Sequence, residues 1–493
     1  MMLVIPLAGC ENMLDVDSTR TVSEKHTWER MEDTRAALMG VYALTKSALV
    51  DRNAFWLYGE VRSGDFAIPL RGDLRAIAEN ELNANDETLE ALRNWRRWYA
   101  VINAANIFME RSQEVREKDH RYTANNHQVD MAQARFLRAF AYFYISRIWG
   151  DVPLITRSSE HSFTNKGRED KDKVLAWVKQ ELLAAAEDLP FMYSANDPQQ
   201  QGNYYNELGS RWNGALVTKI SAYAVLAHLS AWSGNYPDAS AYTAFVDLNY
   251  AKSNINYATT SNLTNASGFF YDKHSSQMFA FPAVWAHAEA AFTGHIEELT
   301  LAAPVVNKNI PDIYMTKERI VQIFNEPKDQ RFDIDTLGNP LTEAYFTNFN
   351  GRYPIFSKIK CIQGGVADPS FRIFSSALVF SRIEDVTLLR AEALAVLGDR
   401  EGAVEMLDRI RENRGLPVYN EANNGDLIDA IFRERHRELM GEGHRWYDLI
   451  RYHKIKNSDP EFMNLIAEGG IYWPIAEALL QQNDLLDQNN YWK

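Results

Sequence analysis

Apolar residues recur every three or four positions along most of the chain, and this is the spacing of one face of an α-helix. The pattern predicts long helices in the first half of the chain, at residues 27–49, 86–110, 131–149 and 170–189. The first should begin at Thr27, whose hydroxyl can cap a helix. The third is apolar on almost every side, so it should be buried among other helices. The periodicity therefore predicts an all-α protein.

Two later segments repeat each other. The stretch AHLSAWSGNYPDAS begins at Ala227, and AEALAVLGDREGAV begins at Ala391. The same residue type falls at matching positions of the two: Ala227/Ala391, Ala231/Ala395, Gly234/Gly398 and Ala239/Ala403. Alanine lets two helices approach closely, and glycine can end a helix in the left-handed conformation. The repeat predicts tetratricopeptide-like helix pairs that stack on one another.

Residues 50–85, 194–210 and 253–381 lack this helical period. The last stretch is rich in Asn, Gly, Pro, Phe and Tyr, and it separates the two repeated segments. Loops carried by a rigid scaffold are where binding residues concentrate. We expect residues 27–493 to form a single domain, with a large irregular, loop-rich ligand-binding insertion at about residues 253–381.

The N-terminus suggests a membrane anchor. The stretch Leu7-Ala8-Gly9-Cys10 ends a short apolar run and matches a bacterial lipobox, in which a peptidase cleaves before the cysteine and its thiol carries a lipid. Residues 1–9 would then be a signal remnant and residues 10–26 a polar tether, with lipidation at Cys10. The alternative is a chance cysteine at the start of a cytoplasmic protein. No later run reaches the roughly 18 to 20 apolar residues of a spanning helix.

Charge and motifs exclude several classes of function. The net charge is −14 with Lys and Arg scattered, so the cationic face that nucleic acid requires is not expected. Neutral ligands fit best, although a local Arg could still capture a single carboxylate. Two cysteines cannot build a zinc site, and neither His436 nor His444 has a partner at metal-ligand spacing. We expect no metal, no cofactor and no enzymatic activity.

The stretch RERHRELMGEGHRWYDLIR, residues 433–451, has the residue types of an active site. Another interpretation is structural. Its arginines and glutamates alternate along a helix that Gly441 and Gly443 would end, and Arg–carboxylate pairs of bidentate geometry can lock two helices together. We favour structural clamps, with Trp446 in the core, over a ligand site.

Several motifs resemble those of the SusD/RagB family, the outer-membrane nutrient-binding lipoproteins of Bacteroidetes. AQARFLRAFAYFYISRIWGDVPLI, residues 132–155, is similar to the family's AEARFLRAYYYF…YGDVPLI. The 433–451 stretch resembles ERRxELxxEGxRWFDLxR, and SRIEDVTLLRAEAL, from Ser381, resembles IRLAEVLLxRAEA. YWPIAEALLQQNDLLDQNNYW, from Tyr472, resembles the C-terminal motif, except that Ala476 replaces its second Pro. The resemblance spans essentially the whole chain.

The resemblance implies tetratricopeptide-like helix pairs, an irregular ligand-binding half, and a partner: a SusC-like TonB-dependent outer-membrane transporter. Most members with known ligands bind glycans, and a minority handle peptides. We therefore expect a lipid-anchored protein of the outer membrane, on the cell surface, that captures an oligosaccharide and passes it to the transporter. A peptide-binding RagB-like uptake protein and a secreted helical glycosidase or lyase are the alternatives.

A sugar offers a flat face of C–H bonds, on which Trp and Tyr stack, and hydroxyls, which Asp, Asn and Arg bind. Loop regions with such residues supply the candidates: Trp56, Tyr58, Asp65, Arg71 and Asp73 near the first helix, and Trp285, His287, Tyr314, Arg352 and Arg372 in the insertion. Trp56 and Trp285 could instead be core residues, and Asp65 and Asp73 could cap turns. Trp95 and Trp98 lie at helical spacing, which favours the core.

Overall fold

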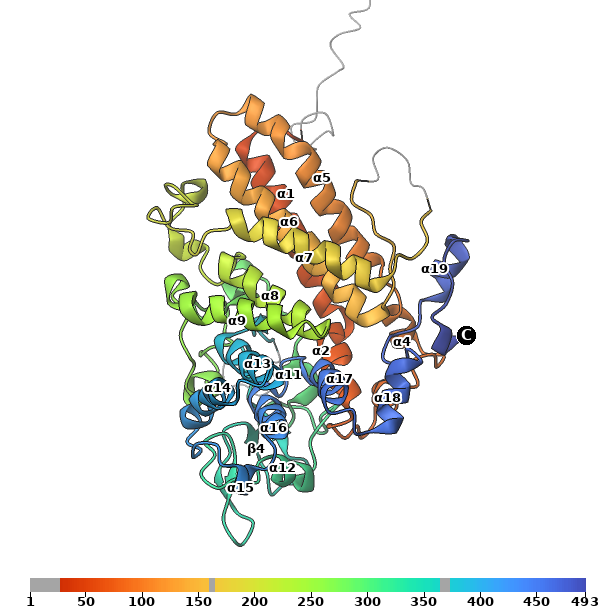
Figure 1. Cartoon of the computed structure of the whole chain (residues 1–493), viewed down its shortest axis with the longest axis vertical. Coiled ribbons are helices and arrows are strands. Elements are labelled where there is room, and N and C mark those ends of the chain that lie inside the picture. The colour runs from red at the N-terminus through yellow and green to blue at the C-terminus, as the bar shows by residue number, and fades with distance from the viewer. Residues whose placement is uncertain (1–26, 159–164, 364–372) are drawn as a thin grey trace, which may run out of the picture.

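The computed structural model describes residues 27–158, 165–363 and 373–493, and helices dominate it (Figure 1). Long helices pack side by side in the upper part of the view: α1 (Met31–Val50), α5 (Arg96–Lys118), α6 (Ala124–Trp149) and α7 (Lys171–Asp188). Almost every residue of α6 from Phe136 onward is buried, because α5 and α7 cover it. In the described part of the chain, no helix has the length and apolar character that crossing a bilayer requires.

The predicted repeat is confirmed. Its two helix pairs are α8 (Lys219–Trp232) with α9 (Tyr236–Asn249), and α13 (Ile383–Val396) with α14 (Arg400–Asn413). Gly234 and Gly398 stand in the turns with φ of 74° and 86°, a conformation that a Cβ would strain. Ala227 and Ala239 form one small core with Ala393, since α13 packs against both α8 and α9. The alanines of the repeat therefore mark helix contacts.

The remaining helices are short or follow the second pair. Three of them come early in the chain: α2 (Ala54–Gly59), α3 (Gly72–Ala78) and α4 (Glu87–Leu92). The others lie near the C-terminus: α15 (Glu421–Asn424), α16 (Leu427–Leu439), α17 (Arg445–Lys456), α18 (Pro460–Ala467) and α19 (Glu477–Gln482). α16 packs against α13 and α17, which joins the 433–451 stretch to the repeat.

The insertion at residues 253–381 is irregular but contains short elements. Its helices are α10 (Thr260–Thr264), α11 (Ile296–Thr300) and α12 (Lys317–Ile323). Its strands form two-stranded antiparallel sheets: β1 (Phe279–Phe281) with β6 (Leu378–Ser381), β2 (Asp333–Ile334) with β3 (Pro340–Thr342), and β4 (Phe346–Thr347) with β5 (Ile355–Phe356). Elements this short cannot establish a hydrophobic period, so the sequence pattern did not predict them.

Three of the predicted helices have other boundaries, and one of them, α6, begins at Ala124 instead of at residue 131. α1 begins at Met31, not Thr27, because the Asp33 carboxylate accepts hydrogen bonds from the backbone N–H of Glu29 (3.0 Å) and Arg30 (2.8 Å) and fixes the first turn there. The helix expected at residues 86–110 is two helices, α4 and α5. Asp86 does cap the first, accepting from Thr88 N at 2.7 Å, but the chain breaks before α5 begins.

Candidate ligand-binding site

Two of the regions predicted to bind a ligand, the loop after α2 and the insertion at residues 253–381, meet in the irregular part of the molecule. Ala67, in the loop after α2, pairs with Tyr314 of the insertion in an antiparallel β-bridge. Ala67 N donates to Tyr314 O at 2.7 Å, and Tyr314 N donates back to Ala67 O at 3.0 Å. The bridge places the stretch that leads to Arg71 and Asp73 next to the stretch 312–314.

Arg71 lies at the centre of the charged groups in this place. Its Nε donates to Asp73 Oδ1 at 2.8 Å, and its Nη1 is 3.6 Å from Asp312 Oδ2. Lys308 Nζ lies 3.1 Å from the same Asp312 oxygen. Burial raises the pKa of the Asp73 carboxyl, but the Arg71 guanidinium outweighs burial and the net shift is downward. The half-exposed guanidinium is therefore held between two carboxylates, of which the Asp312 side chain is 21% exposed and the Asp73 side chain 9%.

Aromatic rings complete the arrangement. Tyr314 and Tyr353 are half-buried, and their rings meet edge to face with centroids 5.0 Å apart at 79°. The exposed Arg352 guanidinium lies 5.1 Å from the centroid of the Tyr353 ring, and no carboxylate within the described residues forms an ion pair with it. We call Arg71, Asp73, Asp312, Tyr314, Arg352 and Tyr353 the Arg71 cluster. It combines ring faces, a free guanidinium and carboxylates.

Trp285 and His287 lie on a separate exposed loop, residues 284–293, which we call the Trp285 loop. Trp285 is 45% exposed and Phe292 is 60% exposed, which is unusual for such large apolar side chains. The loop is attached to α1, because Glu289 Oε2 is 3.2 Å from Lys46 Nζ. The alternative that Trp285 is a core residue is therefore excluded in this structure.

Trp56 and Tyr58 lie elsewhere, in the core. Trp56 is 4% exposed and donates through Nε1 to Gly441 O at 3.1 Å, while the Tyr58 hydroxyl donates to Leu92 O at 2.6 Å. α2 is pressed onto the turn after α16 so closely that a Cβ on Gly59 would lie 2.0 Å from Gly443 O. Neither ring has a face open to a ligand, which matches the core alternative for Trp56.

Asp65 is also withdrawn from the surface. It forms ion pairs with Arg319 and with Arg445 at 2.9 Å, and its carboxylate lies 3.1 Å from His436 Nε2. Burial raises its pKa, but the histidine and the two arginines outweigh burial and hold the pKa well below the usual range. This aspartate joins α12, α16 and α17 and is not free for a ligand. Cys10 and Arg372 lie outside the described residues.

The 433–451 stretch forms the buried ion network that the structural interpretation predicts. Glu438 accepts from Arg382 at 2.8 Å, from Arg414 at 2.7 Å and from Arg331 at 3.1 Å, and all four side chains are fully buried. Burial raises the Glu438 pKa, and the three arginines reverse the shift to well below its ordinary value. We call these four residues the Glu438 network. With no exposed charge, it cannot contact a ligand from solvent.

Two other arginines of the same stretch, Arg435 and Arg451, also form buried ion pairs. Arg435 binds Asp448 (3.0 Å) and Asp385 (3.0 Å), and Arg451 makes a bidentate pair with Glu392, with both hydrogen bonds at 2.8 Å. These pairs tie α16 and α17 to α13 of the repeat. Trp446, expected in the core, is 6% exposed.

Comparison with known proteins then decides the family. A crystal structure of a SusD superfamily protein from Bacteroides thetaiotaomicron is 45% identical, with a TM-score of 0.86, and covers 94% of this chain and 99% of that one. The chain belongs to the SusD family. The model of the SusD family matches residues 363–492, and a second model, described as starch-binding and associating with the outer membrane, matches residues 29–204.

More distant SusD relatives agree. SusD-like protein P38 of Formosa agariphila is 26% identical, and the match covers 98% of this chain and 96% of that protein. The B. fragilis NanU structure is 18% identical with a TM-score of 0.69, covers 97% of this chain and all of that one, and shows the same fold. The helical repeat and the irregular insertion are thus the common architecture of this SusD-family chain and its relatives.

The structure assembles one potential metal cluster that the sequence spacing did not suggest: His228, Asp385 and His444, all buried, with ligand atoms within 4.8 Å of one another. Hydrogen bonds already occupy both oxygens of the Asp385 carboxylate. Asp385 Oδ2 is 2.7 Å from both His228 Nε2 and Ser381 Oγ, and Oδ1 accepts from Arg435 at 3.0 Å. A divalent cation would have to displace these bonds beside a guanidinium, so the donor set fits a structural role better than a metal site.

Sequence reasoning missed Asp312 and Lys308. Asp312 stands two residues before Tyr314 and binds Arg71 from the opposite side to Asp73. Its signal was present in the stretch PDIYM, but only the tyrosine was selected as a sugar-binding residue. Lys308 lies only four residues before Asp312, but the loop after α11 has no helical period from which this contact could be predicted.

Proposed function

We propose that this SusD-family protein binds an oligosaccharide on the surface formed by the Arg71 cluster and the Trp285 loop. The observation that carries the proposal is the Tyr314–Tyr353 pair beside two arginines and two carboxylates. The tyrosine faces suit the C–H face of a sugar, and the charged groups suit its hydroxyls through charge-assisted hydrogen bonds. Trp285 and His287, exposed on their own loop, would extend the contact along a longer glycan.

The same groups favour binding without cleavage. A glycosidase needs a carboxylic acid whose pKa is raised so that it can protonate the leaving oxygen. The pKa of Asp73 is instead lowered by Arg71. Burial also raises the pKa of Glu60 to about 8 and the pKa values of Asp130 and Glu297 to about 7, but all three carboxyls are at most 1% exposed and accept hydrogen bonds within the fold, so they cannot reach a sugar. A protein that captures its ligand intact is the better fit.

Delivery would follow capture. The family membership supports a protein held at the outer membrane by a lipid on Cys10, on the cell surface. The partner would be a SusC-like TonB-dependent transporter, which receives the oligosaccharide from the exposed loops. We propose the irregular side for the oligosaccharide contacts because the ring faces of Tyr314 and Tyr353 lie there beside charged groups.

Titration calorimetry against a panel of neutral oligosaccharides tests the binding proposal. Tyr353→Ala should weaken binding roughly tenfold, on the order of 1.4 kcal/mol, because the sugar loses its stacking partner. Tyr250→Ala is the matched control, since Tyr250 is half-buried and meets Tyr257 edge to face at 5.8 Å and 80°, away from the Arg71 cluster. Its affinity should equal that of the wild type.

Three results would contradict the proposal. Equal affinity of the Tyr353→Ala variant and the wild type would show that the oligosaccharide does not bind at the Arg71 cluster. Cleaved products after incubation with the panel would show a glycosidase or lyase. A rise in melting temperature with peptides and not with glycans would instead establish the peptide-uptake alternative, because only a ligand of the folded state stabilises it.

A further inference from the structure

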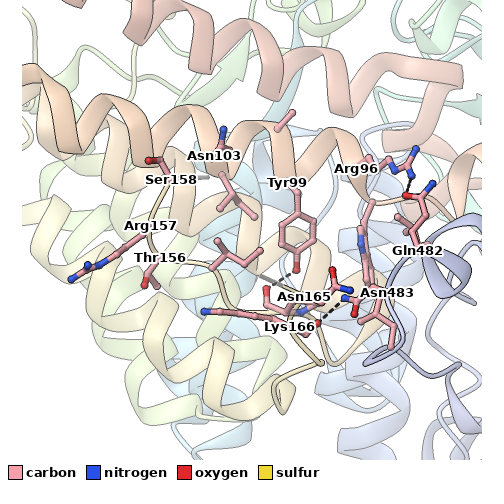
Figure 2. A pocket seen from close by; sticks show the side chains of 17 residues that line it. Arg96, Tyr99, Asn103, Thr156, Arg157, Ser158, Asn165, Lys166, Gln482 and Asn483 are labelled. Carbon is pink, nitrogen blue, oxygen red and sulfur yellow. Dashed lines mark hydrogen bonds between the residues drawn. The ribbon is translucent and has the colours of Figure 1, made fainter. Parts of the chain in front are cut away.

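A cavity lies among the long helices, away from the insertion, between the start of α5 and α19 (Figure 2). Its volume is about 870 Å³, and the described residues that line it come from three separate parts of the chain: residues 95–103, residues 153–158 with 165–166, and residues 479–486. Hydrogen bonds hold these parts together. The Tyr99 hydroxyl donates to Pro153 O at 2.6 Å, and Asn483 Nδ2 donates to Lys166 O at 2.9 Å. We call it the α5–α19 pocket, and its walls are fixed by contacts within the chain.

The charge of the lining is the unexpected feature. Arg96, Arg157 and Lys166 line the pocket, and none of the described residues that line it is Asp or Glu. No carboxylate of the described residues forms an ion pair with any of the three: Arg96 binds the Gln482 side chain and Lys166 binds Leu154 O. In Figure 2, Arg96 and Arg157 lie toward opposite ends, with Lys166 between them. The cations are thus available along the length of the pocket.

Two acids lie near the pocket but outside its lining. Glu110 accepts from Ser158 N at 2.9 Å, and Asp484 Oδ1 is 3.5 Å from the amide of Asn165. Both carboxylates bind uncharged groups, and neither forms an ion pair with any of the three cations. This contrasts with the net charge of −14 for the whole chain, which predicted neutral ligands. Beyond about 10 Å that net charge is screened at ordinary ionic strength, and the local cations dominate.

The rest of the lining suits a sugar body. Ile102, Pro153, Ile155, Leu479 and Leu486 provide apolar surface, which can cover the C–H face of a pyranose. Asn165, Gln482 and Asn483 provide side-chain amides, which bind hydroxyls as donors and acceptors. Apolar surface, amides and unpaired cations in one cavity match a ligand that is sugar-like and anionic.

We propose that the α5–α19 pocket is a second ligand site, selective for oligosaccharides that carry carboxylate or sulfate groups. Arg96, Lys166 and Arg157 would bind successive acidic groups, and the apolar surface would contact the rings between them. The site is separate from the Arg71 cluster, so it can bind even if the Arg71 cluster binds nothing.

Calorimetry with trigalacturonate, a sulfated galactotriose and neutral galactotriose tests the proposal. The wild type should bind at least one acidic trisaccharide at least tenfold more tightly than the neutral one, since charge-assisted hydrogen bonds distinguish them. The double variant Arg157→Gln/Lys166→Gln should lose about tenfold of that affinity. Comparing the carboxylate with the sulfate identifies which acid the pocket prefers.

Two controls keep the result specific. Arg116→Gln removes one positive charge from an exposed position of the same helix α5 and should leave the affinity unchanged. Tyr353→Ala tests the Arg71 cluster and should also leave binding of acidic sugars to the pocket unchanged, which separates failure of this site from failure of the first. Equal affinity of the double variant and the wild type would overturn the proposal. So would equal binding of galactotriose and both acidic trisaccharides.

Discussion

Arginine and carboxylate residues serve different purposes in two regions of this protein. In the Glu438 network, three arginines and their glutamate are fully buried, and every charge is bound within the fold. In the Arg71 cluster, the Arg71 side chain is 39% exposed, and Arg352 stacks on Tyr353 without a carboxylate. The same residue types therefore lock helices together where water is excluded and remain available to a ligand where it is not.

The largest effect should come from the Glu438 network. Glu438→Gln would leave three buried guanidinium groups without their shared carboxylate, and we expect the free energy of unfolding to fall by about 3–5 kcal/mol. Urea denaturation measures this change. Glu421→Gln is the control, because Glu421 pairs with Arg400 at 2.7 Å on the surface, where such a pair contributes about 0–1 kcal/mol. Equal losses of unfolding free energy in the two variants would show that the buried network stabilises the fold no more than the exposed pair does.

The free energy of unfolding should depend on pH through Asp130, which lies in α6. Burial raises the pKa of Asp130 to about 7, although Tyr122, Tyr204 and Tyr205 donate to it. An unfolded aspartate ionises near pH 3.9, so between about pH 4 and pH 7 the unfolded state has released a proton that the folded state keeps. This group therefore makes the free energy of unfolding fall as pH rises through that window.

Asp130→Asn removes the titration. The stability of the variant relative to the wild type should increase from pH 4 to pH 7, as measured by urea denaturation at each pH. Asp73 provides the opposite case in the irregular region, because its pKa is lowered in the folded protein. Its contribution to the free energy of unfolding is lost as the pH falls below the ordinary pKa of an aspartate. A relative stability of Asp130→Asn that stays constant over the window would show that Asp130 is ionised in the folded protein.

The smallest effect on stability should come from the Arg71 cluster itself. Arg71→Gln should change the free energy of unfolding by less than about 1 kcal/mol, because the pair is half-exposed, yet it should weaken oligosaccharide binding about tenfold. Arg409→Gln is matched to it: Arg409 is 32% exposed and pairs with Asp247 in the helical repeat. That variant should bind as the wild type does. Weaker binding in both would mean that the loss reflects folding and not contact.

The sequence was informative wherever structure is local. The repeat around Gly234 and Gly398 follows from the spacing of its alanines and glycines, and the burial of α6 follows from apolar residues on almost every side of that helix. The structural role of the 433–451 stretch could also be predicted from its charge pattern. Its partners could not, because Arg331, Arg382 and Arg414 come from distant parts of the chain that only the fold brings together.

The candidate site was harder to predict for the same reason. Trp56 and Trp285 are both tryptophans in apparent loop regions, but one lies under the Gly441–Gly443 turn and the other is exposed. Local sequence does not encode which neighbour will cover a ring. Asp312 and Tyr314 join Arg71 through a β-bridge across almost 250 residues, and the α5–α19 pocket is built from three segments none of which has a binding motif of its own.

A crystal structure of the protein with a bound neutral oligosaccharide tests the central claim most directly. The account predicts an intact sugar against the Tyr314 and Tyr353 rings, with hydroxyls bound by Arg71 or its carboxylates and the Glu438 network unchanged. A sugar seated beside Trp446 and the 433–451 stretch, or one found cleaved between two carboxylates, would contradict it.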